Sequence, residues 1–219
     1  MCGRFAQSQP LIHYAHALDP NWNPEQDKRP PTWNLAPEQF SWAFVSGGEE
    51  ILTTVLKWGL LPSWADKDDT RPINAKAETA ATKPYFRKAW KSGRCLIPAD
   101  GWYEWTEVPK VGKQPWFLHR ADNDPVLFAG LWEHNSHSGN STFVILTMAT
   151  DGKMKEVHDR KPVVLERKEA RHWIEPTLSL DEIQRVASSA LKDNQFEWYR
   201  VSTQVNSPRN DGPDLLNPV

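Results

Sequence analysis

Short apolar runs, many of them rich in β-branched or aromatic residues, recur along the chain between Gly, Pro, Asn and Asp. This pattern is typical of strands. The predicted strands are residues 51–58, 94–98, 116–119, 126–132, 142–149 and 162–165. In the middle of the chain they follow one another without intervening helices, which favours an antiparallel sheet or barrel over parallel winding.

Other segments place apolar residues at helical spacing. The predicted helices are residues 11–18, 79–91, 153–157, 166–174 and 179–190. The last begins at Ser179 and has Glu182 three residues later, the pattern of a capping box. Residues 19–37 are rich in Pro and Asn and are predicted to form an irregular loop. We therefore expect one α+β domain over residues 1–219, with a mainly antiparallel β core or barrel and peripheral helices.

The composition excludes several classes of protein. A chain of 219 residues is long enough to bury a core without disulfides. Two cysteines are too few for a disulfide framework or a zinc cluster, so neither metal nor cofactor is expected. Apolar runs fall far short of the ~20 residues of a membrane span, and the chain start does not resemble a signal peptide. A soluble, cytoplasmic protein that does not bind membranes is expected.

A net charge of −2 means that any nucleic-acid binding must come from a local patch. Residues 76–94 carry six bases and one acid, whereas residues 19–50 carry six acids and two bases. The basic segment is a candidate phosphate-facing surface, although an ordinary solvated helix face has the same composition. Most of the 12 tryptophans are expected in the core, and a few are candidates for stacking on bases.

The start of the chain, MCGRF, holds a candidate nucleophile. Removal of Met1 is favoured when a small residue follows, and it would leave Cys2 with a free α-amine beside its own thiol. The ordinary pKa of an α-amine is about 7.7–8.0, so part of it is neutral at pH 7 and can condense with an aldehyde. The thiol can then close onto the imine carbon to give a thiazolidine. Since most cysteines at position two have no such role, this segment alone decides nothing.

Three polar residues lie in segments that otherwise look structural. Asn74 lies between a strand-like piece and a helix start. Glu104 is surrounded by aromatic residues, where burial would raise the pKa of its carboxyl group, as a general acid or base requires. His158 follows a helix-like run and could move a proton near neutral pH. The alternatives are an exposed strand position for Glu104 and an ordinary turn position for His158.

Six motifs occur in order along the chain. They are MCGRF from residue 1, WNLAP from 33, WGLLP from 58, NAKAET from 74, GWYEW from 101 and HDRKP from 158. In this combination the sequence resembles the SRAP family, the SOS-response-associated peptidases that process abasic sites in DNA. The resemblance runs from Cys2 to about Val219.

The resemblance implies a covalent function on DNA. Family members bind abasic sites in single-stranded DNA and attack the ring-opened sugar aldehyde with the N-terminal cysteine, which gives a thiazolidine crosslink that shields the lesion. The implied partner is single-stranded DNA, or a junction of single and double strands, that carries abasic sites. A monomer associated with the nucleoid is expected, and lyase, crosslink-reversal and self-processing activities are associated with the family.

Carried over by position, the motifs assign a role to each residue. Cys2 is the nucleophile, and Asn74 holds the opened sugar or the Cys2 backbone. Glu104 moves protons, and His158 assists protonation of the sugar oxygen and reversal of the crosslink. Trp64 is implied as a wedge or stacking residue where the duplex ends, with a buried core position as the alternative. The residues expected to bind DNA are Arg4, Asn34, Trp64, Lys76 and Arg160.

One position departs from the family pattern, and two other functions stay open. Lys76 stands where this motif commonly has Arg, so it lacks the bidentate guanidinium and is expected to bind phosphate less firmly.

The first alternative function is a thiol peptidase that uses Cys2, His158 and Glu104. The second is a non-covalent reader of modified or single-stranded DNA, for which Cys2→Ala would keep full function.

Overall fold

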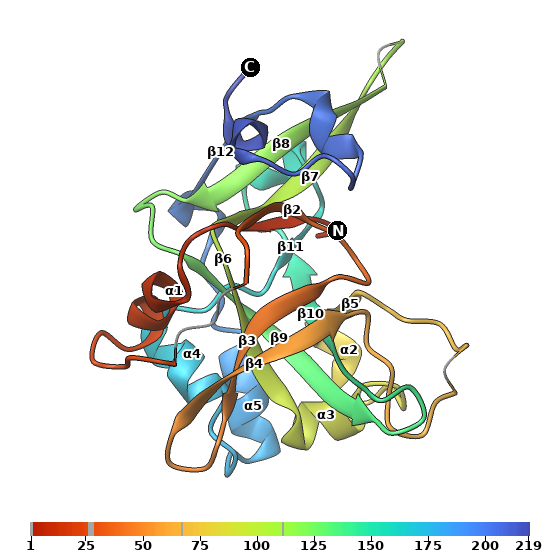
Figure 1. Cartoon of the computed structure of the whole chain (residues 1–219), viewed down its shortest axis with the longest axis vertical. Helices are drawn as coiled ribbons and strands as arrows, with labels where there is room; N and C mark the ends of the chain where they lie inside the picture. Colours follow the sequence, from red (N-terminus) through yellow and green to blue (C-terminus); the bar gives the residue numbers. More distant parts are fainter. Residues whose placement is uncertain (1, 26–28, 67, 111) are drawn as a thin grey trace.

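The computed structural model describes residues 2–25, 29–66, 68–110 and 112–219. Its centre is a closed barrel of five strands in the order β10-β4-β3-β6-β9, in which β9 pairs back onto β10 (Figure 1). β4 and β10 pair in parallel, and the other barrel neighbours are antiparallel. The barrel strands are β3 (Phe40–Ser46), β4 (Ile51–Trp58), β6 (Arg94–Ala99), β9 (Val126–Asn135) and β10 (Asn140–Ala149).

A second, fully antiparallel sheet lies above the barrel in Figure 1, in the order β12-β8-β7-β1-β2. Its strands are β1 (Phe5–Gln7), β2 (Thr32–Leu35), β7 (Gly101–Val108), β8 (Gly112–Arg120) and β12 (Phe196–Arg200). Two three-residue strands, β5 (Asn74–Lys76) and β11 (Arg160–Pro162), both pair with the barrel strand β10. The end of β10 therefore brings β5 and β11 together.

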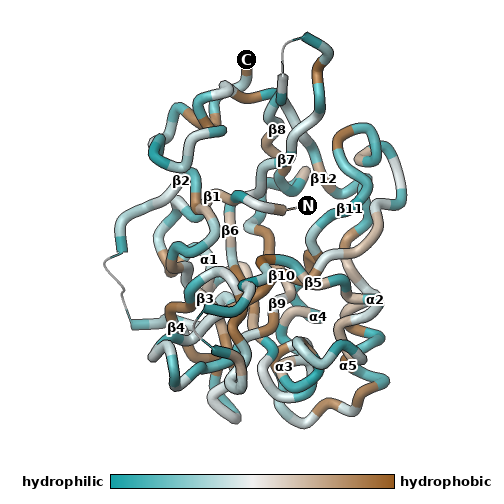
Figure 2. Tube along the Cα trace, turned by 90° about the vertical axis from the view of Figure 1, so that its right-hand side faces the viewer, coloured by the Kyte–Doolittle hydropathy of each residue, from teal (hydrophilic) through white to brown (hydrophobic). Residues whose placement is uncertain are grey.

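Alternation along the barrel strands separates two apolar cores. On β6, Cys95 and Ile97 face the interior and share a core with Phe5 and Trp102 of the second sheet, whereas Leu96 belongs to the core beneath the helices. In Figure 2, β9 and β10 run through the middle, with α3, α4 and α5 below them and β7, β8 and β12 above. The helices are α1 (Leu11–Leu18), α2 (Ala77–Ala80), α3 (Arg87–Ser92), α4 (Arg167–Trp173) and α5 (Leu180–Ala187). The 3-10 turns are η1 (Lys153–Glu156), η2 (Asp193–Gln195), η3 (Thr203–Asn206) and η4 (Pro213–Leu216).

The predicted α+β class, with a mainly antiparallel β core and peripheral helices, is confirmed. The capping box is also confirmed, because the Ser179 hydroxyl accepts a hydrogen bond of 3.3 Å from the Glu182 amide. None of the described helices has the length and apolar character needed to cross a membrane.

Three sequence predictions were wrong in part. The helix predicted over 79–91 is divided into α2 and α3 because Pro84, which lies between them, disfavours a continuous helix. The loop predicted over 19–37 contains β2 near its end. The strand predicted over 162–165 is instead mostly outside regular strands, although Val164 forms an isolated bridge with Phe128.

Candidate functional site

The position of Cys2 is set by strand β1. Phe5 pairs with Leu35 on one side and with Trp102 on the other, so β1 lies between β2 and β7. The Tyr103 amide donates a hydrogen bond of 3.0 Å to the Arg4 carbonyl, which extends the pairing towards the chain start. Because β1 and β7 are antiparallel, the residues before Phe5 run alongside the part of β7 that carries Glu104. Cys2 has no exposed surface, and its Sγ lies 3.9 Å from the Arg4 carbonyl oxygen.

Asn74 holds the backbone of Cys2. In β5, Asn74 pairs with Ile145 of β10, which fixes its backbone against the barrel. Its Nδ2 donates a hydrogen bond of 2.7 Å to the Cys2 carbonyl oxygen. Its Oδ1 is buried and has no hydrogen-bond partner among the described residues. The amide therefore binds the chain start with its donor and keeps an acceptor beside it.

Glu104 is a buried acid of β7. It is 2% exposed, and this burial raises the pKa of its carboxyl group to about 7, with a further increase from the negative charge of Asp159. Burial also raises the pKa of the Cys2 thiol well above its ordinary value, and the charge of Glu104 raises it further. Glu104 is thus within electrostatic reach of both Cys2 and Asp159. Of the two environments expected for Glu104, the structure shows the buried one.

His158 lies between η1 and β11. Its Nδ1 accepts a hydrogen bond of 3.0 Å from the Arg160 amide and lies 2.9 Å from Oδ1 of Asp159. These contacts favour opposite protonation states, because the amide needs a bare nitrogen and the carboxylate needs a proton on it. Burial lowers the pKa of His158, which favours the neutral ring with its proton on Nε2.

The predicted phosphate-binding residues differ in their surroundings. Arg160 donates through both terminal nitrogens to the Glu78 carboxylate, at 3.2 and 2.9 Å, and also to the Thr147 carbonyl at 2.7 Å. Its side chain is only 13% exposed. Lys76, which follows Asn74 on β5 after one residue, is exposed. Lys76 therefore presents its charge to solvent, whereas the guanidinium of Arg160 is held by a carboxylate.

Half-buried Arg4 and buried Asn34 form a polar link to the C-terminal segment. Arg4 donates to Oδ1 of Asn34 at 2.8 Å and to the Val205 carbonyl at 3.0 Å. Asn34 is 1% exposed, and its amide donates to the carbonyls of Val205, Ser207 and Asn210. The contacts of Asn34 are thus those of a structural residue, and a contact with DNA stays a prediction.

Trp64 lies in the segment between β4 and β5 and is 58% exposed. It makes an edge-on contact with Tyr85 at a centroid distance of 5.7 Å. No contact among the described residues connects it to Cys2, Asn74 or Glu104. At the end of the basic segment, Arg94 is 5% exposed and donates to the carbonyls of Trp173 and Glu175, so it cannot belong to a phosphate-facing surface.

Sequence reasoning gave no role to several residues around these groups. Asp159 contacts His158, and Glu78 pairs with Arg160; both lie within motifs, which was the available signal. Lys161 is the next residue of the HDRKP motif, and its buried Nζ donates to Oδ1 of Asp193 at 2.6 Å. Oδ2 of Asp193 accepts hydrogen bonds from the amides of Asp151 and Gly152. The Lys161–Asp193 pair therefore holds the start of the segment that leads to His158.

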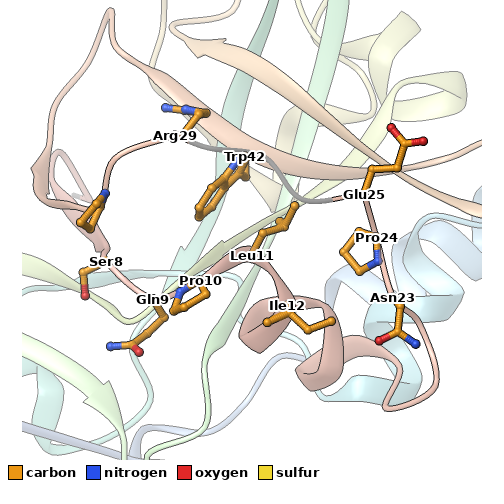
Figure 3. Close-up of a pocket in the computed structure, with 11 residues that line it drawn as sticks. Ser8, Gln9, Pro10, Leu11, Ile12, Asn23, Pro24, Glu25, Arg29 and Trp42 are labelled. Carbon is orange, nitrogen blue, oxygen red and sulfur yellow. The ribbon is translucent and has the colours of Figure 1, made fainter.

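A pocket of about 550 Å³ lies away from these residues, between the start of α1 and residues 23–25, 29 and 31 (Figure 3). Trp42 forms part of its wall, with the Arg29 guanidinium 5.7 Å from the ring centroid. Neither Cys2 nor Glu104 lines it, so it is separate from the candidate site. The described residues include no group of three or more His, Cys, Asp or Glu side chains that could hold a metal ion.

The sequence model of the family described as SOS response associated peptidase (SRAP) matches residues 1–208. The chain belongs to the SRAP family. It is 36% identical over 228 residues to the abasic site processing protein YedK of Escherichia coli (strain K12), and the match covers 100% of both chains. It is 33% identical to the abasic site processing protein YoqW of Bacillus subtilis (strain 168), with 99% of both chains covered.

Solved structures agree with the SRAP assignment. A phage-related protein from Bordetella bronchiseptica superimposes with a TM-score of 0.78 at 32% identity, covering 92% of this chain and 95% of that one. A protein from Bacteroides thetaiotaomicron superimposes with a TM-score of 0.80 at 22% identity, covering 98% and 99%, and this likeness shows the fold alone. The resemblance expected from the six motifs is confirmed by the match to the family model and by the two relatives.

Proposed function

We propose that this SRAP chain recognises abasic sites in DNA and captures them covalently through Cys2. The observation that carries the proposal is the 2.7 Å hydrogen bond from Asn74 to the Cys2 carbonyl, which holds the start of the chain beside a buried carboxyl group. The names of YedK and YoqW, which process abasic sites, support the choice of DNA lesion. Cys2, Asn74, Glu104 and His158 are the proposed catalytic residues.

The chemistry begins with removal of Met1, which lies outside the described residues. The freed α-amine of Cys2 attacks the C1′ aldehyde of the ring-opened abasic sugar, and one amine proton moves to the oxygen to give a carbinolamine. A second proton from the Glu104 carboxyl group converts the hydroxyl into water, which leaves behind a protonated imine. Sγ of Cys2 then adds to the imine carbon, and the thiol proton returns to the Glu104 carboxylate. The products are a thiazolidine and one water molecule.

The environment of Glu104 suits both proton transfers. A pKa of about 7 leaves part of the group protonated and part ionised near neutral pH, so it can donate first and accept later. We assign His158 a hydrogen bond from Nε2 of its neutral ring to the sugar oxygen, which assists protonation of that oxygen, because a neutral imidazole is too weak an acid to supply the proton itself. Asn74 keeps its buried Oδ1 as an acceptor for the opened sugar.

The proposed partner is single-stranded DNA, including its junctions with duplex, bound by a cytoplasmic monomer near the nucleoid. Arg4, Lys76 and Arg160 are proposed to bind phosphates, with Asn34 acting through Arg4 and Trp64 stacking at the junction. Phosphate contacts fix register without reading bases, so little sequence preference is expected. No metal or cofactor is needed for the steps described.

The test uses single-stranded DNA with one uracil, incubated with and without uracil glycosylase, and denaturing gels. The wild-type protein, with removal of Met1 verified by intact mass, should give a heat-stable shifted band only after glycosylase treatment. Cys2→Ala should give none. Cys95→Ala is the matched control, because Cys95 is also fully buried but lies in the barrel interior, and it should crosslink normally. Absence of the band with processed wild-type protein would exclude covalent capture.

A thiol peptidase that uses the same residues is the second candidate, because Cys2 and Glu104 are within electrostatic reach. A cysteine peptidase needs a thiolate, whereas burial and the charge of Glu104 raise the pKa of this thiol. Removal of Met1 by the purified protein itself, or cleavage of added peptides, would support it. A non-covalent reader would instead retain full DNA affinity and no crosslink in both wild-type and Cys2→Ala proteins.

A further inference from the structure

The second sheet places an exposed arginine in the same cross-strand row as Glu104. Glu104 of β7 lies opposite Trp116 of β8, and Trp116 lies opposite Arg200 of β12. Directly opposite residues of antiparallel strands point to the same face of a sheet. Because adjacent strands lie about 4.8 Å apart, the backbone of Arg200 is about 10 Å from that of Glu104.

Strand alternation separates the charges of these strands between the two faces. Glu107 and Glu197 are each three residues along the strand from Glu104 and Arg200, so they point to the opposite face of the sheet. Arg120 of β8 shares the face of Glu104, but its guanidinium is bound by the carboxylate of Asp122. On the described parts of β7, β8 and β12, Arg200 is thus the cation of this face that no carboxylate binds.

The guanidinium of Arg200 is held in place by an aromatic ring, and none of the described residues accepts a hydrogen bond from it. It lies 5.2 Å from the centroid of the Trp116 ring, and the Trp116 indole donates a hydrogen bond of 2.9 Å to Oγ1 of Thr106. Arg200 is exposed, and its carbonyl accepts a 3.0 Å hydrogen bond from the Val219 amide, which fixes the strand end. The side chain is therefore positioned by an aromatic ring and open to solvent.

A planar guanidinium with free donors matches the geometry of a phosphate group. We propose that Arg200 binds a phosphate of the DNA strand next to the abasic nucleotide captured at Cys2, and that Trp116 holds the guanidinium for this contact. The inference rests on the proposed function, since it takes DNA as the ligand. It adds a phosphate contact on β12 to those proposed for Arg4 before β1 and for Lys76 and Arg160 beside β10.

Reversible binding tests this contact without crosslinking. The probe is a single-stranded oligonucleotide with a tetrahydrofuran abasic analogue, which has no aldehyde, and fluorescence anisotropy gives the Kd at several salt concentrations. Each phosphate contact contributes about 0.7 to the slope of log K against log salt for single strands. Arg200→Gln should lower the slope by about 0.7, and Arg200→Lys should keep the slope because it keeps the charge. Arg185→Gln is the matched control on α5 and should behave as wild type.

A wild-type slope for Arg200→Gln, with an unchanged melting temperature, would overturn the inference. An equal loss in Arg185→Gln would also overturn it, because the effect would then be one of net charge. Crosslinking of authentic abasic DNA by the wild-type protein is measured in parallel. If wild type crosslinks and the Arg200→Gln slope is unchanged, only this inference fails. If wild type does not crosslink and the slope falls, the phosphate contact stands and the covalent function fails.

Discussion

The side-chain amide of Asn74 donates a 2.7 Å hydrogen bond to the backbone carbonyl of Cys2, which joins two short segments that are 72 residues apart. One segment is the start of the chain in the second sheet, and the other is β5 on the barrel. The proposed nucleophile is therefore held from both sheets. This relationship makes the first prediction specific to one side chain.

Replacement of Asn74 by Leu, which has a similar shape, should slow crosslinking to abasic DNA about tenfold. The Cys2 carbonyl would lose its donor, and such a loss is worth about 1–3 kcal/mol in a buried site. Single-turnover crosslinking on denaturing gels gives the rate. Asn140→Leu is the control, because Asn140 donates to Ser138 in a turn between β9 and β10. A wild-type rate for Asn74→Leu would show that this hydrogen bond does not position Cys2.

The buried carboxyl group of Glu104 should make stability depend on pH. Its pKa is about 7 in the folded protein and about 4.3 in the unfolded chain, so the folded state binds an extra proton between these values. The free energy of unfolding must therefore fall as the pH rises through this window, by about 3 kcal/mol. Glu104→Gln should remove this dependence. Urea denaturation of both proteins at pH 4.5 and pH 8 measures it, and parallel pH profiles would contradict a buried titrating Glu104.

The same group should shape the pH dependence of crosslinking. The α-amine of Cys2 is neutral above about pH 8, whereas Glu104 is protonated below about pH 7, so the rate should pass through a maximum between them. In Glu104→Gln the rate should fall about a hundredfold and rise steadily with pH, since only the amine titrates. Rates measured from pH 5.5 to pH 9 give both profiles. A descending limb that persists in Glu104→Gln would assign it to another group.

The buried pair formed by Lys161 and Asp193 should be essential to stability. Asp193→Ala leaves the Lys161 ammonium group, whose side chain is 1% exposed, with only the more exposed Asp151 carboxylate at 3.3 Å and the Leu191 carbonyl, so the free energy of unfolding should fall by about 3 kcal/mol. Because this pair also fixes the segment before His158, the crosslinking rate should fall as well. Chemical denaturation gives the free energy of unfolding. Combining Asp193→Ala with Lys161→Met should recover most of the lost stability, and failure to do so would mean that the carboxylate acts mainly through the Asp151 and Gly152 amides.

Removal of the carboxylate that binds Arg160 should strengthen DNA binding. Glu78→Gln keeps the size of the side chain but removes the charge that competes with phosphate for the guanidinium. The Kd for single-stranded DNA at low salt should fall about threefold, with a steeper salt dependence. Anisotropy titrations with Glu169→Gln as control test this, because Glu169 pairs with Arg185 on the helical side. An unchanged Kd would mean that Arg160 does not reach the DNA.

Long, strongly patterned elements could be predicted from the sequence. Residues 51–58 and 11–18 were predicted with the bounds that the structure shows, because eight residues are enough to display a period. Strands β1 and β5 have three residues each and were not predicted. Such strands exist only because partners from distant parts of the chain pair with them, β2 and β7 with β1 and β10 with β5, and no local pattern records those partners.

The surroundings of the site residues also differ in how far the sequence could predict them. The sequence left burial and exposure of Glu104 both open, because the adjacent aromatic residues Tyr103 and Trp105 point to the opposite face of β7. The cross-strand neighbour Trp116 on its own face is not visible in the local sequence. The partner of Arg160 could not be predicted, because Glu78 lies 82 residues away and meets it only through the pairing of β11 and β5 with β10. Asn34 looked suited to binding DNA, yet its hydrogen bonds go to three carbonyls of the C-terminal segment, which sequence spacing does not reveal.

The place of β1 between β2 and β7 has a mechanical consequence. Tension on a DNA strand joined to Cys2 would pull β1 along its own axis, so the hydrogen bonds to both neighbouring strands would be sheared together rather than unzipped one at a time. Beyond β1, the Asp100 carboxylate accepts from both the amide and the hydroxyl of Ser8, at 2.8 and 2.7 Å, and anchors the strand further. The start of the chain is therefore arranged so that many hydrogen bonds resist such tension at the same time.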